Sequence, residues 1–221
     1  MIKTSDGCDY PDDRLYYVDH DIWLKPAADR AYRVGVAKPF LFYSGRLSRI
    51  TCRSVGSFIR QNTSLALLVS SRMEGALLTP FDCKVTAVNA AALSNPDIVS
   101  EDPYGDGWIV EVAAEGPTPR LLEATEASKA YELKNRERGV VCLDIVPHYE
   151  IKVFGETCES ILSQVGDYMQ MHIKQGETLH VITSDPATEV DMISWAEKTG
   201  QGLLEIRRVG KTLHVLYRRL V

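Results

Sequence analysis

The chain has 221 residues, of which 45% are hydrophobic and 25% are charged, and its formal net charge is −5. This composition is typical of a soluble globular protein with room for two compact domains, and the net charge favours neither an acidic nor a basic partner. The first ten residues lack the apolar run of a signal peptide, and the longest aliphatic run, residues 65–69, is too short to span a bilayer. We therefore expect a cytoplasmic protein without a membrane segment.

The chain begins with a region of strand-like segments. From residue 16 to residue 112, β-branched, aromatic and leucine-rich stretches alternate with short breaks such as "SVGS", "SSRMEG" and "DPYGDG". This spacing predicts a small antiparallel β sandwich or barrel. Residues 116–139 then read as one helix that closes the first domain, with Gly139 as its C-terminal cap. We place the end of this domain at residue 145.

The second domain, residues 146–221, has a different pattern. A strand near residues 149–154 precedes an amphipathic helix that stops by Gly176, and a strand and a second helix follow. Asp185 and Pro186 are the expected N-cap and first residue of that second helix. Two more strands flank "GK", so the order is β-α-β-α-β-β, a two-layer sandwich. The overall fold class is α+β.

Five cysteines are spread along the chain without a CxxC or CxxH pair. They are Cys8, Cys52, Cys83, Cys142 and Cys158. An odd number at such spacing in a cytoplasmic protein predicts reduced thiols and argues against both a disulfide framework and a structural zinc site. We expect no metal.

Two histidines occur in the repeated tetrapeptide "TLHV". Strand alternation places Leu179 and Leu213 under the helices and leaves His180 and His214 on the other face of the sheet. No third ligand accompanies them, so they are expected to face solvent or a partner rather than a metal.

Several stretches of the first domain carry a family resemblance. "NPDIVSEDPYGDGWIVEV", residues 95–112, resembles the corresponding stretch of the glycine-cleavage H protein, and "TPFDCKVTAVN" resembles the family's Ala-Pro-x-x-Gly-x-Val-x-x-Val-Asn. Tyr17 and Trp23 keep the family's tyrosine-to-tryptophan spacing. The similarity covers about residues 15 to 138. It implies a lipoyl-type β barrel with a C-terminal helix.

The lipoyl lysine of that family is missing. With Pro80 and Asn89 in register, the family's Glu-Ser-Val-Lys-Ala falls on residues 69–73, so Arg72 replaces the lysine. An arginine stays protonated and cannot form the lipoyl amide, and the nearest lysine, Lys84, belongs to the next strand. We therefore expect no cofactor.

Without the lipoyl group, the barrel is expected to serve as a docking domain. Its hairpin presents the cation of Arg72 and the flexible apolar Met73, which suit recognition of a partner surface. The alternative is an ordinary charged turn that is solvated and has no function.

The second domain resembles the TusA/SirA-type sulfur carriers. Their pattern is Leu-Gly-x-x-Cys-Pro-x-Pro at the first helix, then Gly-Glu-x-Leu, then Asp-Asp-Pro-Ala-Thr-x-x-Asp-Ile. The matching positions are Phe154, Gly155, Cys158, Gly176, Glu177, Leu179, Asp185, Pro186, Ala187, Thr188 and Asp191. The resemblance implies a persulfide carrier that receives sulfur from a desulfurase or rhodanese-like donor and passes it to an acceptor that the sequence does not identify.

Cys158 is the candidate catalytic residue. It lies where the first strand gives way to the helix, and the free amides and positive end of the helix dipole there favour a thiolate. Attack of one sulfur on another, the step of sulfur relay, requires a thiolate. Glu159 stands where the family has proline and opposes this ionisation. The neighbours Gly155, Glu156, Thr157 and Glu159 are the candidate partner-binding residues of this site. A structural cysteine is the alternative.

Basic residues gather on the last two strands, at Arg207, Arg208, Lys211, Arg218 and Arg219. Only Tyr217 interleaves them, so nucleic-acid binding is not favoured. The preferred hypothesis is a sulfur carrier, an enzyme only in the sense of a sulfurtransferase, that uses Cys158 and a non-lipoylated docking domain. The competing hypothesis is a non-catalytic adaptor built from two carrier domains that have lost their chemistry.

Overall fold

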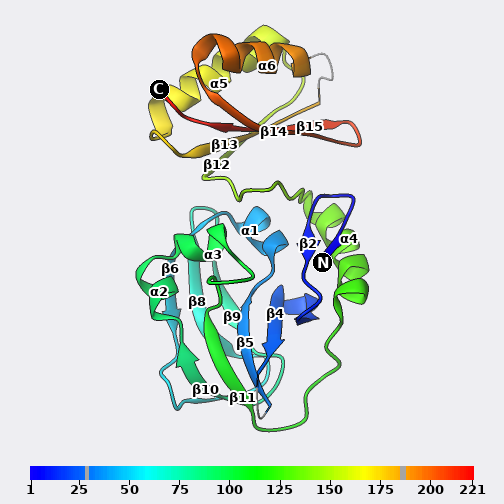
Figure 1. The fold of residues 1–221 in the computed structure, drawn as a ribbon, viewed down its shortest axis with the longest axis vertical. Coiled ribbons are helices and arrows are strands. Elements are labelled where there is room, and N and C mark those ends of the chain that lie inside the picture. The colour runs from blue at the N-terminus through cyan, green and yellow to red at the C-terminus, as the bar shows by residue number, and fades with distance from the viewer. Residues whose placement is uncertain (28–29, 185–187) are drawn as a thin grey trace. The chain divides into compact units, whose positions relative to one another are not determined.

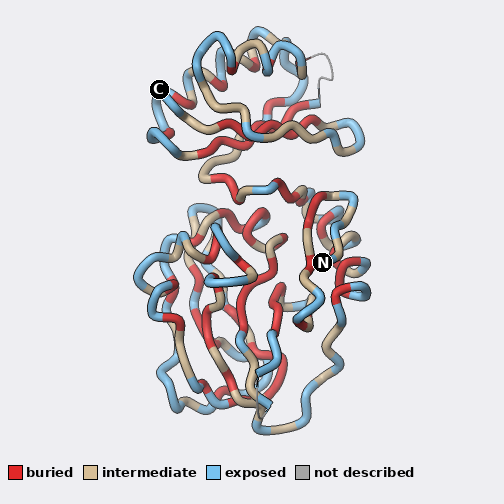
Figure 2. The backbone as a smooth tube through the Cα atoms, viewed as in Figure 1, coloured by how far each residue is buried: buried red, intermediate tan, exposed pale blue. Residues whose placement is uncertain are grey.

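The computed structural model describes residues 1–27, 30–184 and 188–221. The chain divides into two compact units, Met1–Val146 and Pro147–Val221 (Figure 1). Each unit has its own buried residues, which are drawn in red in Figure 2. The two units are taken in turn.

Antiparallel sheets form the first unit. The larger sheet has the order β3-β4-β5-β11-β10-β7. Its strands are Leu15–Tyr17, Ile22–Pro26, Ala31–Val36, Val110–Ala114, Cys83–Val88 and Phe58–Ile59. A three-stranded sheet pairs β6 (Leu47–Cys52), β8 (Ser64–Ser70) and β9 (Glu74–Leu78), and a short hairpin pairs β1 (Ile2–Lys3) with β2 (Asp9–Tyr10). The predicted antiparallel β architecture is present.

Helices occupy more of the first unit than the sequence pattern predicts. Within the region expected to be strands and short breaks lie the short helices α1 (Lys38–Ser44), α2 (Ala90–Ser94) and α3 (Asp97–Glu101), and η1 (Val18–His20) is a 3-10 turn. In α1, Pro39 lies in the first turn, where proline costs no hydrogen bond. No helix in the described part of the chain is long and apolar enough to cross a membrane.

The last helix of the first unit, α4, spans Ala124–Arg138 rather than residues 116–139. The expected start was wrong because Pro117 and Pro119 favour extended backbone before the helix. The end was right, since Gly139 follows with φ +64, the left-handed conformation of a C-terminal cap.

A buried tryptophan braces the larger sheet against the loop that follows α3. Trp23 on β4 is 1% exposed, and its Nε1 donates to the carbonyl of Pro103 at 2.9 Å. The indole lies directly over Gly35 of β5, where an added Cβ would come within 2.5 Å of Trp23 Cζ2. Glycine at this position is therefore a packing requirement.

The loop 102–108 is held from both sides. The Asp102 carboxylate accepts hydrogen bonds from the amides of Gly105 and Asp106 at 3.0 and 2.8 Å. Asn89, 6% exposed, donates through Nδ2 to the carbonyls of Asp106 and Trp108, both at 2.7 Å, while its Oδ1 caps α2. The "DPYGDGW" motif is thus a structural brace in this fold.

The second unit has the order β12, α5, β13, α6, β14, β15. These elements span Tyr149–Val153, Cys158–His172, Thr178–Thr183, Thr188–Thr199, Gly202–Val209 and Thr212–Arg218. The sheet order is β12-β13-β15-β14, with β12 parallel to β13 and the other pairs antiparallel. Asp185 and Pro186, the expected start of the second helix, lie outside the described residues.

Both helices of the second unit lie on one face of its sheet (Figure 1). The core joins Val165 and Met169 of α5 and Met192 of α6 to Leu179 and Leu213 of the sheet. The predicted inward side chains of β13 and β15 therefore pack under the helices.

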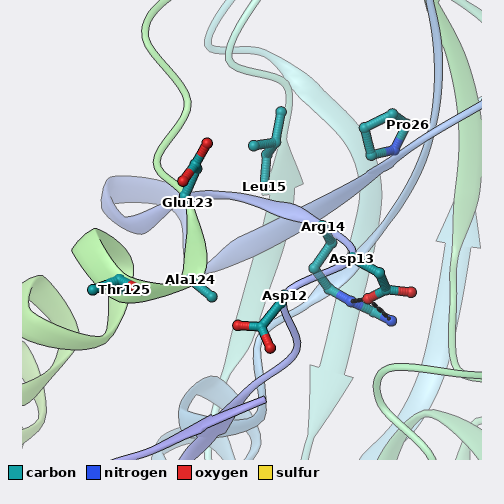
Figure 3. A pocket seen from close by; sticks show the side chains of 8 residues that line it. All are labelled: Asp12, Asp13, Arg14, Leu15, Pro26, Glu123, Ala124 and Thr125. Carbon is teal, nitrogen blue, oxygen red and sulfur yellow. Dashed lines mark hydrogen bonds and ion pairs between the residues drawn. The ribbon is translucent and has the colours of Figure 1, made fainter.

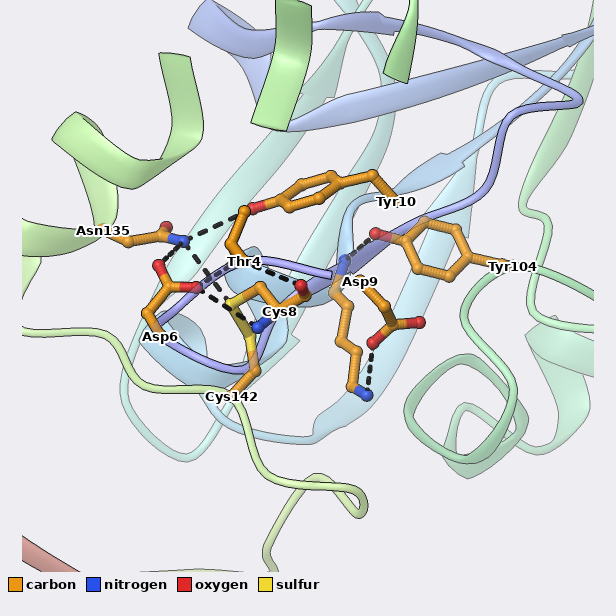
Figure 4. The surroundings of a disulfide bond; sticks show 9 residues. Thr4, Asp6, Cys8, Asp9, Tyr10, Tyr104, Asn135 and Cys142 are labelled. Atoms are coloured by element: carbon orange, nitrogen blue, oxygen red, sulfur yellow. Dashed lines mark hydrogen bonds and ion pairs between the residues drawn. A yellow bond between two sulfur atoms is a disulfide. The ribbon is translucent and has the colours of Figure 1, made fainter. Parts of the chain in front are cut away.

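The expectation of five reduced thiols was wrong. Cys8 and Cys142 form a disulfide, with their Cα atoms 4.8 Å apart (Figure 4). The partners are 134 positions apart in the sequence, so no spacing motif indicates the pair, and the fold alone brings them together. Cys52, Cys83 and Cys158 are in the reduced state.

The expectation that His180 and His214 face solvent or a partner was also wrong. They do lie on the sheet face away from the helices, but they are only 1% and 3% exposed. His180 Nε2 lies 3.0 Å from His214 Nδ1. The other ring nitrogen of His180, Nδ1, lies 3.1 Å from Glu150 Oε2, and that of His214, Nε2, lies 3.0 Å from Thr212 Oγ1. The two imidazoles satisfy each other, which permits their burial.

This histidine pair predicts acid sensitivity of the second unit. Burial, with the neighbouring His180 adding to it, lowers the pKa of His214 from its usual 6.5 to about 4. Below pH 6.5 the unfolded chain therefore binds a proton that the folded chain refuses until about pH 4. Stability is complete above pH 6.5 and falls by about 3 kcal/mol as the pH drops through this window.

Urea unfolding at pH 7 and pH 4.5 measures this effect. A His214→Gln chain should lose this part of the pH dependence, whereas His172→Gln, at an exposed position of α5, should keep it. Equal pH dependence in the wild type and His214→Gln would show that His214 does not supply it.

Candidate functional site

The hairpin between β8 and β9 carries Arg72, at the position where the family resemblance predicts a lysine. Arg72 lies at its exposed tip, and its Nη1 donates to the carbonyl of Phe42 in the last turn of α1 at 3.0 Å. A cation is favoured at the C-terminal end of a helix, where carbonyl groups are unpaired. The side chain thus folds back on the protein surface.

The base of the tip is fixed to the same helix. Ser70 Oγ donates to the carbonyl of Ser44 at 2.6 Å, and it also accepts from the amides of Arg72 and Met73 at 3.2 and 3.1 Å. Gly45, with φ +84, follows α1 directly beneath the hairpin. The hairpin tip is therefore anchored to the C-terminal end of α1.

Met73 and Lys84 differ in how they relate to this surface. Met73 is half-buried beside Arg72 at the tip. Lys84 belongs to β10, where it pairs with Phe58 of β7 and Ala113 of β11. The lysine is thus in a different sheet from the hairpin, whereas the sequence indicated only that it belongs to the next strand.

Cys158 is the first residue of α5, as the sequence placed it. Its neighbour Thr157 is the N-cap, whose Oγ1 accepts from the amide of Ser160 at 3.4 Å. The Cys158 side chain is half-buried, and its Sγ donates to Oδ2 of Asp191 on α6 at 3.0 Å. A thiol at the start of one helix is thus paired with a carboxylate from the other.

The remaining predicted residues of this site surround the thiol on its own segment. Gly155, with φ +73, turns the chain between β12 and α5, and Gly155, Glu156 and Thr157 are exposed. Glu156 accepts from Ser160 Oγ at 3.0 Å, and Glu159 lies in the first turn of α5. These groups lie on the surface beside Cys158, where a partner can reach them.

Asp191 is the site residue that sequence reasoning missed. It entered only as one position of a resemblance, 33 residues after Cys158, with no role assigned. Nothing in local spacing links the two, since α5 and α6 meet only through tertiary packing.

A cavity of about 410 Å³ lies elsewhere, in the first unit (Figure 3). It is lined by residues just before and in β3, by Pro26 and by the start of α4. Asp13 is paired with both Lys25 and Arg14, which hold the pKa of its carboxyl below the usual range. Arg14 is buried and also bonds the carbonyl of Tyr104 at 2.6 Å. These charges serve the fold, and neither predicted site contributes to this cavity.

Metal binding has no support in the described ranges. Among residues 1–27, 30–184 and 188–221, no three histidine, cysteine or acidic side chains gather in a way that could hold a metal ion.

The first unit matches a known family. The model of the glycine cleavage H-protein family fits residues 15–136, more than half of the chain. The chain belongs to this family. The match lies wholly within the first unit, and the hairpin with Arg72 is part of it.

Relatives of the H-protein family support this assignment. The chain is 36% identical to glycine cleavage system H protein 5 of Aquifex aeolicus over 143 residues, covering 62% of this chain and 96% of that protein. It is 35% identical to a probable glycine cleavage system H protein of Halobacterium salinarum over 123 residues, covering 56% and 94%.

A solved H protein has a similar fold. The crystal structure of the glycine cleavage system H protein from Mycobacterium marinum matches with a TM-score of 0.51 and 27% identity, covering 56% of this chain and 99% of that one. The first unit is therefore an H-protein-type, lipoyl-type domain.

Proposed function

We propose that this chain is a sulfur carrier in which Cys158 accepts and donates sulfane sulfur and the H-protein-type unit docks partner proteins. The observation that carries the proposal is the placement of Cys158. Its sulfur lies at the start of α5, partly open to solvent, 3.0 Å from the Asp191 carboxylate. The resemblance of residues 149–221 to TusA/SirA-type carriers supports the same chemistry.

The transfer step needs no external oxidant or reductant. The Cys158 sulfur, after losing its proton, attacks the outer sulfur of a donor persulfide. One sulfur–sulfur bond forms and one breaks, the donor leaves as a thiolate, and Cys158 becomes the persulfide. Asp191 Oδ2, which accepts from Cys158 Sγ at 3.0 Å, is the proposed acceptor for the departing proton.

The first unit is proposed to bring a partner to this site. The anchored hairpin offers a cation and a half-buried methionine at Arg72 and Met73, and the covalent link between units raises the local concentration of the docked partner. The expected partners are a desulfurase or rhodanese-like donor and an acceptor of unknown identity.

Intact mass spectrometry tests the proposal. The chain is incubated with a cysteine desulfurase and cysteine, and it should gain the mass of one sulfur that a thiol reductant removes. Cys158→Ser should not gain it. Cys52→Ser is the matched control, because Cys52 is also half-buried and free, and this variant should load normally.

The competing function is a non-catalytic adaptor. Absence of a sulfur adduct on the wild-type chain with this and other persulfide donors would favour the adaptor. The same spectra, recorded after incubation with a lipoate ligase, should show no lipoyl adduct on the wild type, because arginine offers no acylable amine.

A further inference from the structure

We propose that the Cys8–Cys142 disulfide is a redox-controlled anchor for the segment that joins the two units. The joining segment, residues 140–146, follows α4 and leads directly to Pro147, where the second unit begins. The disulfide ties its middle to the N-terminal hairpin β1–β2 (Figure 4). Reduction of this disulfide is expected to release the joining segment and the hairpin from each other.

The contacts around the disulfide concentrate on a few residues of the hairpin. The amide of Cys142 donates to the carbonyl of Asp6 at 2.9 Å. Asn135 near the end of α4 donates to the Asp6 carboxylate at 2.8 Å and lies 3.4 Å from Cys8 Sγ. Farther along the segment, Lys3 Nζ lies 3.7 Å from Asp144 Oδ1. Every one of these contacts joins the N-terminal segment to the end of α4 or the joining segment.

The hairpin has further attachments to the first unit: Lys38 Nζ donates to Asp9 Oδ1 at 2.7 Å, and Ser5 Oγ donates to Glu132 Oε1 at 3.4 Å. It consists of two strands of two residues each, which pair only with each other. Tyr10 stacks on Tyr131 of α4 with ring centroids 5.2 Å apart. So short a hairpin is not stable by itself, and the covalent bond is expected to add to these contacts in holding it in place.

At its far end the joining segment is held by buried side chains, Leu143 and Val146, and by a hydrogen bond. Arg46 donates to the carbonyl of Val146 at 3.2 Å, and this arginine is also paired with Asp97 and Glu101. In the oxidised chain the segment is therefore held at Cys142 and at Val146. In the reduced chain the attachment at Cys142 is lost, and only the non-covalent contacts hold residues 140–146.

The chemistry of release is a thiol–disulfide exchange with a dithiol reductant. A thiolate of the reductant attacks one sulfur of the bond, and its second thiol resolves the mixed disulfide. The two electrons come from the dithiol, which ends as a disulfide, and both cysteines end as thiols. Cys8 and Cys142 are each fully buried, so exchange requires that the hairpin open first.

The test compares the full chain before and after treatment with dithiothreitol. Alkylation and mass analysis should count three free thiols in the oxidised chain and five in the reduced chain. Hydrogen exchange of the Cys142 amide and of peptides covering residues 1–10 and 140–146 should accelerate at least about tenfold on reduction. Hydrogen exchange in β10, which belongs to the larger sheet and not to the hairpin, should not change.

Matched variants separate this proposal from the sulfur-carrier function. Cys142→Ser should show the fast exchange without reductant, and Cys52→Ser should behave as the wild type. The experiment is repeated in a Cys158→Ser chain, where the anchor should respond as before even though sulfur loading is lost. If Cys142→Ser does not fold, reduction of the wild type still gives the answer. Five free thiols after treatment with diamide, or equal exchange of residues 140–146 in both redox states, would overturn the anchor.

Discussion

Replacing Gly35 with alanine is expected to lower the free energy of unfolding of the first unit by about 3 kcal/mol. The new methyl group would lie 2.5 to 2.9 Å from three atoms of the Trp23 indole. The indole cannot retreat easily, because its Nε1 is bonded to the carbonyl of Pro103 and the ring is buried. Urea unfolding followed by circular dichroism measures the loss.

Gly116→Ala is the matched control for this substitution. A Cβ on Gly116 would meet its nearest neighbour, the Cβ of Asp82, at 3.9 Å, which is ordinary contact. Its effect should stay within about 0.5 kcal/mol of the wild type. Equal unfolding midpoints for the two variants would mean that the sheet can shift away from Trp23, and the packing account of Gly35 would be wrong.

Replacing Asn89 with alanine is expected to cost a similar amount, about 3 kcal/mol. The side chain caps α2 through Oδ1 and bonds two carbonyls of the 102–108 loop through Nδ2. Alanine removes all of these bonds and leaves the carbonyls of Asp106 and Trp108 without this donor. In thermal unfolding of the full chain, the first unit should unfold at a lower temperature than it does in the wild type.

One further variant separates the contributions of Oδ1 and Nδ2 to stability, and a second is its control. Asn89→Asp keeps the helix cap and loses both donors, so it should remain destabilised. Asn95→Ala, at an exposed position in the same stretch, should have little effect. If Asn89→Asp were as stable as the wild type, the bonds to the loop would contribute nothing and the cap alone would explain the result.

Much of the architecture could be predicted because it is written in local patterns. Alternation in β13 and β15 predicted which side chains lie under α5 and α6, and Gly139 predicted where α4 ends. The short helices α1, α2 and α3 could not be predicted in this way, since segments of five to seven residues show less than two turns of periodicity. Tertiary packing decides their conformation.

In the candidate sites, too, some features could be predicted from local sequence and others depend on tertiary contacts. Local sequence predicted the placement of Cys158 at a helix start, and the family resemblance alone predicts that Arg72 stands at a lysine position. That Arg72 bonds the end of α1, that Asp191 accepts from Cys158, and that Cys8 meets Cys142 depend on contacts between distant parts of the chain. Burial of His214 depends on its pairing with His180, which alternation alone does not reveal.

The strand order of the second unit has a consequence for its biosynthesis. β15 is the last strand along the chain, yet it lies between β13 and β14, which do not pair with each other. While the ribosome is still translating this stretch, the sheet lacks an inner strand and its two histidines have not met. The H-protein-type unit can become native during translation, whereas its neighbour must wait until residue 218 has left the exit tunnel.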